Sequence, residues 1–405
     1  MFEKLPEPAG DEILQLASAF REDARSDKMD LGIGVYRDAL GKTPIMQAIK
    51  AAELSLYKDE QSKSYLGLIG DERFNGALLH LVLGDEVPYD RIRAIQTPGG
   101  GGGVRLLAEF IRIATPGATV WVANPTWINH RPIMDFVGLR IRLYDYLDRD
   151  SQLVSFDRMI GQLAAAAHGD VVLVQGCCHN PSGANLTLEQ WSDIVNLANK
   201  NGLVPFIDIA YQGLGDGLVA DAQAARFVAG HVPELLLAVS CSKNFGVYRD
   251  RVGCAALVAS TSSEADLAKA TLASLARVNY SFPPNHGAAT VRRVLETPEL
   301  KAKWAEELEQ MRQRILANRV ALASALRARM DSARFDFIAT HRGMFSLLGI
   351  TASQVQELRE KHAIFMPGDG RINLAGLQQA NIERLSSALQ AVVAGDASVA
   401  RRNRR

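Results

Sequence analysis

Between residues 90 and 260, short apolar runs rich in β-branched residues alternate with longer stretches of helical character. Six runs read as strands: IRAIQT (92–97), ATVWVA (118–123), LRIRLYDY (139–146), DVVLVQG (170–176), LVPFIDIA (203–210) and LLLAVS (235–240). Strands that alternate with helices in this way are typical of α/β proteins. The alternation therefore predicts a mostly parallel sheet that is covered by helices on both faces.

Polar or glycine-rich segments follow five of these runs directly. They are GGGGG (99–103), NPTW (124–127), HNPSG (179–183), Asp208 with Tyr211, and Ser240–Lys243. In open α/β sheets, ligands bind beyond the carboxyl ends of the strands. We therefore expect these five segments to converge on one crevice.

Beyond residue 290 the pattern changes. The segment 298–330 has one continuous helical periodicity, with charged residues on its outer face. Strand-like FDFIAT (335–340) and MFSLLGI (344–350), a helical stretch, the short segments IFMP and RINLAGL, and a last helical stretch follow. Since 405 residues are too many for one small core, this part predicts a second, smaller α+β domain.

Charge and cysteine content exclude several classes of protein. Forty-five basic residues balance forty-five acidic ones, so no overall field favours nucleic acid or an anionic membrane. No apolar run is long enough to cross a bilayer, and the first twenty residues lack the apolar core of a signal peptide. The four cysteines predict free thiols, and adjacent Cys177 and Cys178 lack metal-ligand spacing, so no metal is expected. We expect a cytoplasmic protein.

Lys243 lies in SCSKNFGVYRDR (240–251), shortly after an apolar run. A charged side chain at the end of such a strand suggests a functional role. Asp208, at the end of the preceding run, is costly to bury unless it meets a cation. The protonated ring nitrogen of pyridoxal phosphate would be such a cation. Asn180 and Tyr211 could bond the phenolic oxygen of that ring, and Trp127 could stack on it. An aspartate at the end of a strand often caps a helix, and a tryptophan often packs in the core. In combination with Lys243, however, these residues favour a binding site for the cofactor.

A phosphate group would need its own ligands. Five glycines before a helix leave main-chain N–H groups free for an anion, although alone they could equally be a flexible loop. Ser240, Ser242 and Arg251 could add two hydroxyls and a bidentate guanidinium. Together with these three residues, the glycine run more strongly indicates a phosphate site.

The segment SCSKNFGVYRDRVG (240–253) resembles the lysine signature of class I aminotransferases of fold type I, in the subgroup of aspartate and aromatic-amino-acid aminotransferases. Other segments are similar to motifs of the same subgroup: LGIGVYRD (31–38), KSYLGLIGD (63–71), QTPGG (96–100), NPTWINH (124–130), GCCHNPSGANLTLEQW (176–191), DIAYQGLGDGL (208–218), RVNYSFPPNHGA (277–288), GMFS (343–346) and GRINLAG (370–376). The resemblance extends from about residue 8 to about residue 395.

The resemblance implies the fold type I of pyridoxal-phosphate-dependent transferases, with a mostly parallel seven-stranded sheet. It implies a large cofactor-binding domain over residues 45–297 and a small α+β domain made of residues 1–44 and 298–405. It also implies cis peptide bonds at Asn124–Pro125 and Asn180–Pro181.

The resemblance further implies a role for each residue of the cofactor site. Lys243 would form the Schiff base with pyridoxal 5'-phosphate and carry the proton, with Asp208 and Tyr211 as the other catalytic residues. The phosphate would be held by Gly100, Gly101, Ser240, Ser242, Arg251 and, from the neighbouring subunit, Tyr65. The ring would be held by Trp127, Asn180, Asp208 and Tyr211, with His130 supporting Asp208.

For the substrate, the resemblance implies that Arg371 clamps the α-carboxylate, helped by Gly34, Asn180 and Trp127. Arg277 of the neighbouring subunit would meet the side-chain carboxylate of a dicarboxylic substrate, and the pocket would be completed by Ser281, Phe282 and Phe345. Because Tyr65 and Arg277 would act across an interface, a homodimer with shared active sites is expected.

Two departures from the family pattern bear on the substrate. Gly101 stands where the family often has a hydroxyl residue, so one phosphate contact is lost. Phe282 stands where aspartate-specific members carry a small polar residue, which makes the pocket more apolar and most similar to that of bacterial aromatic-amino-acid aminotransferases. We therefore expect ping-pong transfer of the amino group of Phe, Tyr, Trp and aspartate to 2-oxoglutarate.

Other functions remain open at this point. An aspartate aminotransferase with little aromatic activity is the main alternative. A nicotinamide-dependent dehydrogenase would leave Lys243, Asp208 and Tyr211 unexplained. A lyase or decarboxylase of the same fold type would have no use for both Arg277 and Arg371, and a regulator that binds the cofactor would usually carry a DNA-binding module.

Overall fold

The computed structural model describes residues 2–5, 10, 12–85 and 87–402, with side chains up to residue 394. Its centre is a seven-stranded sheet in the order β2-β8-β7-β6-β5-β3-β4. The strands are β2 (Ile92–Pro98), β3 (Thr119–Asn124), β4 (Arg140–Asp145), β5 (Val171–Gln175), β6 (Val204–Ile209), β7 (Leu235–Ser240) and β8 (Val252–Val258). Strand β8 is antiparallel to both of its neighbours, and the other neighbouring pairs are parallel. This confirms the predicted sheet. Small residues give β8 little β-branched character, so it is not among the six runs read as strands.

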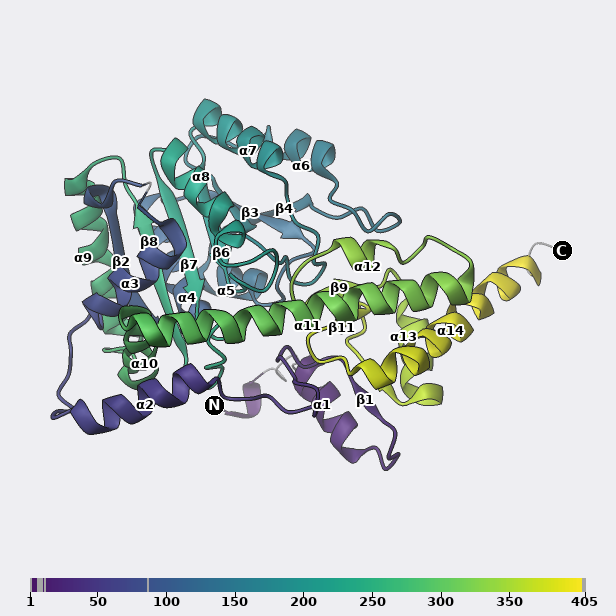
Figure 1. Ribbon diagram of the computed structural model, residues 1–405. Helices are drawn as coiled ribbons and strands as arrows, with labels where there is room; N and C mark the ends of the chain where they lie inside the picture. Colours follow the sequence, from purple (N-terminus) through teal and green to yellow (C-terminus); the bar gives the residue numbers. More distant parts are fainter. Residues whose placement is uncertain (1, 6–9, 11, 86, 403–405) are drawn as a thin grey trace.

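Helices cover both faces of the sheet (Figure 1). One apolar core joins the sheet to α4 (Gly99–Ala114), α5 (His130–Val137) and α9 (Ser262–Asn279). A second core joins the opposite face to α2 (Gln47–Asp59), α3 (Glu72–Leu83), α6 (Phe156–Leu163), α7 (Leu188–Asn201), α8 (Gln223–His231) and α10 (Asn285–Glu296). Both faces are therefore apolar, as a sheet between two helical layers requires.

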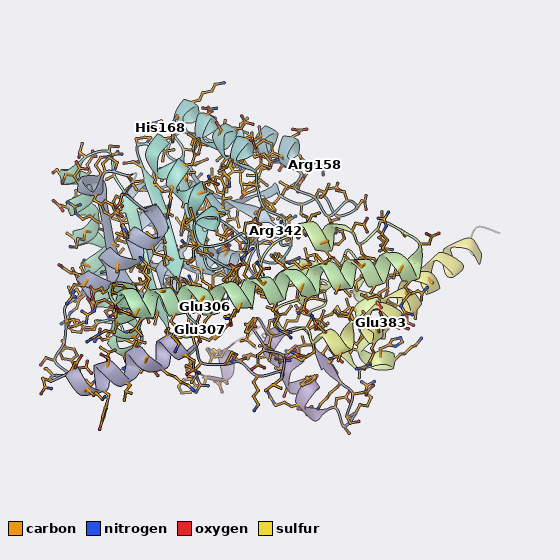
Figure 2. All side chains as sticks on the ribbon, in the orientation of Figure 1. Arg158, His168, Glu306, Glu307, Arg342 and Glu383 are labelled. Atoms are coloured by element: carbon orange, nitrogen blue, oxygen red, sulfur yellow. The ribbon has the colours of Figure 1, made fainter. Side chains whose placement is uncertain are left out.

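Helix α11 (Pro298–Met330) runs from the sheet to the C-terminal part of the chain (Figure 1), as its periodicity predicts. Its residue Glu307, labelled in Figure 2, accepts hydrogen bonds from the main-chain N–H groups of Gln47 (2.6 Å) and Ala48 (3.0 Å). These residues begin α2, whose preceding residue Met46 has no capping side chain. A carboxylate from α11 thus satisfies the positive end of α2.

The C-terminal part has its own apolar core. It contains the antiparallel pair β9 (Phe345–Leu347) and β11 (Arg371–Asn373), the parallel pair β1 (Met29–Asp30) and β10 (Ile364–Phe365), and the helices α13 (Ala352–His362) and α14 (Ile382–Arg402). Met29 and Leu31 pack in this core, so the N-terminal segment joins the C-terminal part. The separate core supports the proposed domain division, whose exact boundaries stay a prediction. The remaining short elements are α1 (Glu12–Glu22) and the 3-10 helices Phe2–Lys4, Tyr89–Arg91, Ala220–Ala222 and Gln379–Asn381.

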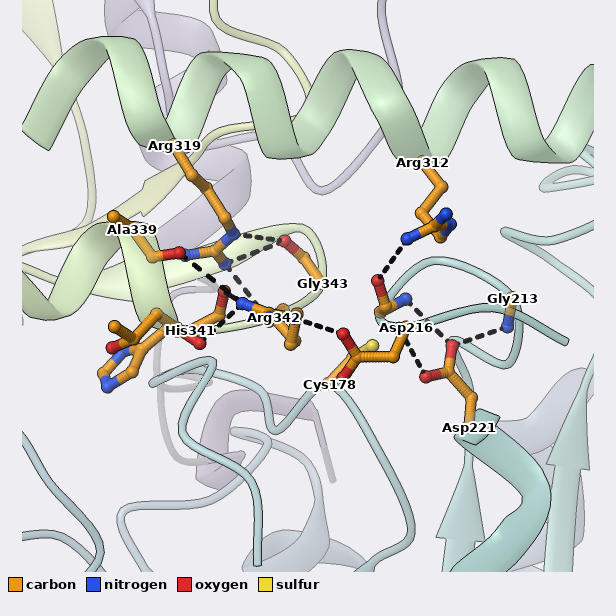
Figure 3. A network of polar contacts seen from close by, with 12 residues as sticks. Cys178, Gly213, Asp216, Asp221, Arg312, Arg319, Ala339, His341, Arg342 and Gly343 are labelled. Carbon is orange, nitrogen blue, oxygen red and sulfur yellow. Dashed lines mark hydrogen bonds and ion pairs between the residues drawn. The ribbon is translucent and has the colours of Figure 1, made fainter. Parts of the chain in front are cut away.

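The prediction of a strand at FDFIAT was wrong, because Phe337–Thr340 forms the one-turn helix α12. Apolar alternation over six residues does not supply a neighbouring strand to pair with. The main chain here bonds within its own turn, and the carbonyl of Ile338 accepts from buried Arg319 of α11. Arg319 also donates to the carbonyls of Arg342 and Gly343 (Figure 3). It donates to the Phe345 carbonyl as well, so it fixes the turn that leads into β9.

All four cysteines are free and buried. The Cys177 and Cys178 sulfurs and an Asp221 carboxylate oxygen lie within 4.8 Å of one another. That carboxylate already accepts three main-chain N–H groups, including that of Gly213 (Figure 3). The contact with Cys177, together with burial, raises the pKa of the Cys178 thiol well above its usual value. These side chains therefore form part of the packing. Within the described ranges, no helix has both the length and the hydropathy that a membrane span requires.

Candidate active site

A cavity of about 220 Å³ opens at the carboxyl ends of the parallel strands. The predicted residues that line it are Gly34, Gly100, Gly101, Trp127, Asn180, Asp208, Tyr211, Ser240, Ser242, Lys243 and Arg251. Each of the five segments that follow the strand-like runs contributes to this wall. The expected convergence on one crevice is thus what the fold produces.

Asp208 is buried next to last in β6 and faces His130. The Nε2 atom of His130 lies 3.0 Å from Oδ2 of Asp208, and its Nδ1 lies 2.8 Å from the hydroxyl of Thr126. Because a carboxylate only accepts, Nε2–H donates to Asp208. His130 has no exposed surface and holds this carboxylate in place from behind, as the resemblance implies.

Lys243 follows β7 by three residues, and its Nζ lies 5.0 Å from the ring centre of Tyr211. Burial lowers the pKa of Lys243 to about 8; Arg251 also lowers it, and Asp208 opposes them. A substantial fraction of this amine is therefore neutral near physiological pH. A neutral amine is a nucleophile and a base, and an ammonium ion is neither.

The glycine run does not form a flexible loop, because all five glycines lie in the first turns of α4. Gly99 has φ +72°, and a side chain on Gly100 would come within 2.7 Å of the Cβ of Ser240. The absence of side chains thus lets the helix N-terminus approach the end of β7. The free N–H groups of that terminus form an anion site.

Arg251 lies at the same end of the cavity. It has φ +54°, a strained conformation that often occurs at functional sites. Its Nη1 donates to the Ser242 hydroxyl (3.3 Å) and to the Tyr248 carbonyl (2.9 Å). Among the described residues no carboxylate pairs with it, so this cation is available to an anion.

Asn180 and Tyr211 meet on another side of the cavity wall. The Asn180 amide donates to the Tyr211 phenol oxygen at 3.2 Å, and burial raises the pKa of Tyr211, so its O–H can still donate. Gln175 holds the main chain of Asn180 through two bonds of 2.8 Å. The peptide bonds Asn124–Pro125 and Asn180–Pro181 are cis, as predicted.

Arg371 of β11 reaches this side from the C-terminal part of the chain. Its Nη2 donates to the Gly32 carbonyl (2.9 Å) and its Nη1 to the Asn180 side chain (3.4 Å). The guanidinium lies over the Phe345 ring at 4.6 Å, and its buried Nε has no hydrogen-bond partner among the described residues. The fork is thus held in place and keeps a donor for an incoming carboxylate.

Seven predicted residues are not among those that line the cavity. His130, Arg371 and Phe345 contact lining residues or one another, as described above. The other four are Tyr65, Arg277, Ser281 and Phe282. They lie together instead. Tyr65 is 83% exposed and stacks on Phe282 at 4.7 Å, and Arg277 donates to the Ser281 hydroxyl at 3.0 Å. This position agrees with the expectation that they serve a neighbouring subunit.

Three lining residues were not predicted: Gln175, Ala210 and Tyr248. Gln175 ends a strand-like run and could have been included by the same rule as Asp208. Tyr248 carries no such signal, because its partners come from a distant part of the chain.

The residues present fit pyridoxal phosphate. The helix terminus, two serine hydroxyls and unpaired Arg251 suit a phosphate, and the Asp208 carboxylate suits a protonated ring nitrogen. Trp127 and the Asn180–Tyr211 pair line the same cavity and suit a ring, and Lys243 supplies the amine for an aldehyde.

Comparison with known proteins agrees with this fit. Residues 26–389 match the family model described as aminotransferase class I and II. The chain is 48% identical to an aromatic-amino-acid aminotransferase of Paracoccus denitrificans over 96% of this chain and 99% of that protein. It is 42% identical to an aspartate aminotransferase of Escherichia coli over 97% of this chain and all of that protein. The structure of an aromatic-amino-acid aminotransferase from Burkholderia pseudomallei, covalently bound to pyridoxal phosphate, matches with a TM-score of 0.94 at 37% identity and covers 97% of this chain and 99% of that one. The chain therefore belongs to the class I and II aminotransferase family.

Proposed function

We propose that this pyridoxal-phosphate-dependent aminotransferase moves the amino group of phenylalanine, tyrosine, tryptophan and aspartate to 2-oxoglutarate. The observation that carries the proposal is the shared cavity of Lys243, Asp208 and Arg251, with Arg371 bonded to its wall. The names of the relatives, which include both aromatic-amino-acid and aspartate aminotransferases, support both substrate types.

The cofactor would be held at its phosphate by Gly100, Gly101, Ser240, Ser242 and Arg251, and at its ring by Trp127, Asn180, Asp208 and Tyr211. Lys243 would bond its aldehyde carbon. When bound, pyridoxal phosphate supplies an electron sink for the negative charge that remains when the substrate Cα loses its proton. Asp208, kept in place by His130, favours the protonated ring nitrogen on which that sink depends.

Lys243 would move the proton. Once the substrate amine has replaced it on the aldehyde carbon, its Nζ, with a pKa lowered to about 8, would take the Cα proton and give it to that carbon. Tyr211, which accepts a hydrogen bond from Asn180, would donate its O–H toward the reacting centre. A pKa near the working pH suits a group that must both accept and give a proton.

Arg371 would bind the α-carboxylate of every substrate. Its fork is fixed by Gly32 and Asn180, and Phe345 packs against its plane. The Gly34 main chain lines the same wall. Because the fork is already fixed, the Arg371 side chain loses little entropy when the substrate binds.

In a homodimer, residues of the partner subunit would contact the substrate side chain and select for it. Arg277 would pair with the distal carboxylate of aspartate or 2-oxoglutarate, and the Phe282 ring at 5.6 Å from that guanidinium would favour aromatic side chains. Because Tyr65 and Arg277 lie outside the cavity of their own chain, two subunits would complete each site. We also propose the division into residues 45–297 and 1–44 with 298–405, and a cytoplasmic location.

The alternative is an aspartate aminotransferase with little aromatic activity, which the hydrogen bond between Arg277 and Ser281 favours because it preforms a carboxylate site. The test compares kcat/KM for phenylalanine and aspartate with 2-oxoglutarate. We expect both to react. An aspartate preference of about a hundredfold or more, with negligible phenylalanine turnover, would favour the alternative, since about 2.7 kcal/mol would then separate the two transition states.

The lysine assignment has its own test. Lys243→Ala should lower transamination by at least about 10⁴-fold, because the covalent anchor and the proton carrier are lost together. Lys243→Arg is the matched control: it keeps a positive charge but no nucleophilic amine, and should be equally inactive. Borohydride reduction of the wild-type enzyme followed by peptide mapping should place the cofactor on Lys243, and a label on any other lysine would contradict the assignment.

A further inference from the structure

The segment Gly32–Arg37, here called the strap, carries Gly34 along the cavity wall. Its main chain is fastened to the C-terminal part of the chain. The Asn373 amide donates to the carbonyls of Ile33 (2.6 Å) and Val35 (2.7 Å), and the Arg37 N–H donates to the Ala375 carbonyl (2.9 Å). These contacts hold one side of the strap.

The other side of the strap is joined to the sheet part by Tyr248. The Tyr36 N–H donates to the Tyr248 phenol oxygen at 3.0 Å. Among the described residues, this is the one hydrogen bond between the strap and residues 45–297. The two residues are 212 positions apart in the chain, so the bond brings two separate segments together beside the cavity.

Tyr248 also connects to the anion-binding end of the cavity. It follows Lys243 by five residues and lines the cavity wall, and its main-chain carbonyl accepts from Nη1 of Arg251. Burial raises the pKa of Tyr248 to about 12, so the hydroxyl stays protonated at neutral pH. Accepting the Tyr36 N–H uses a lone pair and leaves the O–H hydrogen for a second partner.

We propose that Tyr248 is a positioning residue whose hydroxyl fixes the strap, and with it Gly34, against the Lys243 side of the cavity. Without the hydroxyl, a main-chain N–H of the half-buried strap has no partner, and the strap is held from one side only. The cofactor ligands do not lie on the strap. The effect should therefore fall on substrate binding, which rests on the proposed function, and leave cofactor affinity unchanged.

The test compares the holoenzyme of Tyr248→Phe with that of Tyr144→Phe. Tyr144 is a fully buried tyrosine of β4 whose hydroxyl donates to the Leu173 carbonyl, so the control deletes the same atom away from the strap. Hydrogen exchange should be at least about tenfold faster at the Tyr36 amide in Tyr248→Phe and unchanged there in Tyr144→Phe. KM for phenylalanine and for aspartate should rise about tenfold in Tyr248→Phe, with kcat within about twofold of wild type.

The same variants separate the possible failures. Unchanged exchange at Tyr36 in Tyr248→Phe, or a loss of cofactor affinity equal to the rise in KM, would overturn the inference. A general loosening would appear as faster exchange throughout the protein and would also overturn it. If the wild-type enzyme transaminates neither phenylalanine nor aspartate, the proposed function is wrong. Hydrogen exchange at the Tyr36 amide would still show whether Tyr248 holds the strap.

Discussion

Lys243 is the residue whose surroundings change its chemistry most directly. The pKa of its amine is lowered to about 8, chiefly by burial; the Asp208 carboxylate opposes this shift and the Arg251 charge adds to it. An ordinary lysine has a pKa of about 10.4 and is almost fully charged at neutral pH. Burial thus accounts for most of the fraction of reactive amine, and the two opposite charges adjust it.

This balance predicts a pH dependence in cofactor-free protein. Labelling of Lys243 by acetic anhydride, followed by mass spectrometry, should rise with pH with a midpoint at about 8, because the neutral amine reacts. Arg251→Met removes a positive charge and should move the midpoint up. Asp208→Asn removes a negative charge and should move it down. Equal midpoints in all three proteins would show that these charges do not act on Lys243.

Single site residues could be predicted from the sequence where they lie at the end of an apolar run that reads as a strand. Lys243, Asp208 and Asn180 were found because each follows an apolar run. Gln175 was missed although it ends an apolar run, as Asp208 does. Tyr248 was missed because its hydrogen bond with the main chain of Tyr36 joins two distant segments, and no periodicity encodes such a contact.

Among the elements, α4 has the most exacting requirement on its sequence. Its first residues are glycines although glycine disfavours helices, so close approach must compensate for that cost. The need for glycine differs between positions of the glycine run. An added Cβ would lie 2.7 Å from Ser240 at Gly100, but 3.5 Å from Trp127 at Gly101, which is an ordinary contact.

Two alanine substitutions should therefore have opposite effects. Gly101→Ala should raise the free energy of unfolding by about 0.5–1 kcal/mol, since alanine favours the helix, and leave cofactor affinity within about twofold. Gly100→Ala should cost about 1–3 kcal/mol and weaken cofactor affinity at least about tenfold, because α4 must move away from β7. Denaturant unfolding and spectroscopic cofactor titration measure both quantities. Similar behaviour of the two variants would contradict the proposed close approach.

Helices and strands could be predicted where the pattern of apolar residues within the segment was clear. The 33-residue α11 and the six strand-like runs follow from periodicity, and the last helix does too. Strand β8 and helix α12 do not, because β8 is built of small residues and α12 is fixed by buried Arg319 from another helix. Neither cause is local to the segment.

For the whole molecule, exposed apolar side chains lie near the open side of the site. Phe136 is 79% exposed and lines an open hollow with Gly101, Trp127 and Arg251. Tyr65 is 83% exposed and Val278, next to Arg277, is 85% exposed. Exposed apolar side chains favour a protein interface where they gather, as Tyr65 does with Phe282, whose ring also contacts Arg277.

Shared sites predict that two inactive variants restore activity to each other. Lys243→Ala lacks the amine, and Arg277→Ala lacks the arginine offered to the partner, so each alone should turn over aspartate poorly. In a mixed dimer, one site combines intact Lys243 with intact Arg277 from the other chain. Random pairing at equal amounts would restore about a quarter of wild-type activity, because half of the dimers are mixed and each has one complete site. Aspartate turnover after co-expression measures it. Activity no higher than the mean of the two parents would mean that each chain completes its own site, and a mixture of Lys243→Ala with the double variant Lys243→Ala/Arg277→Ala, which cannot form a complete site, is the control.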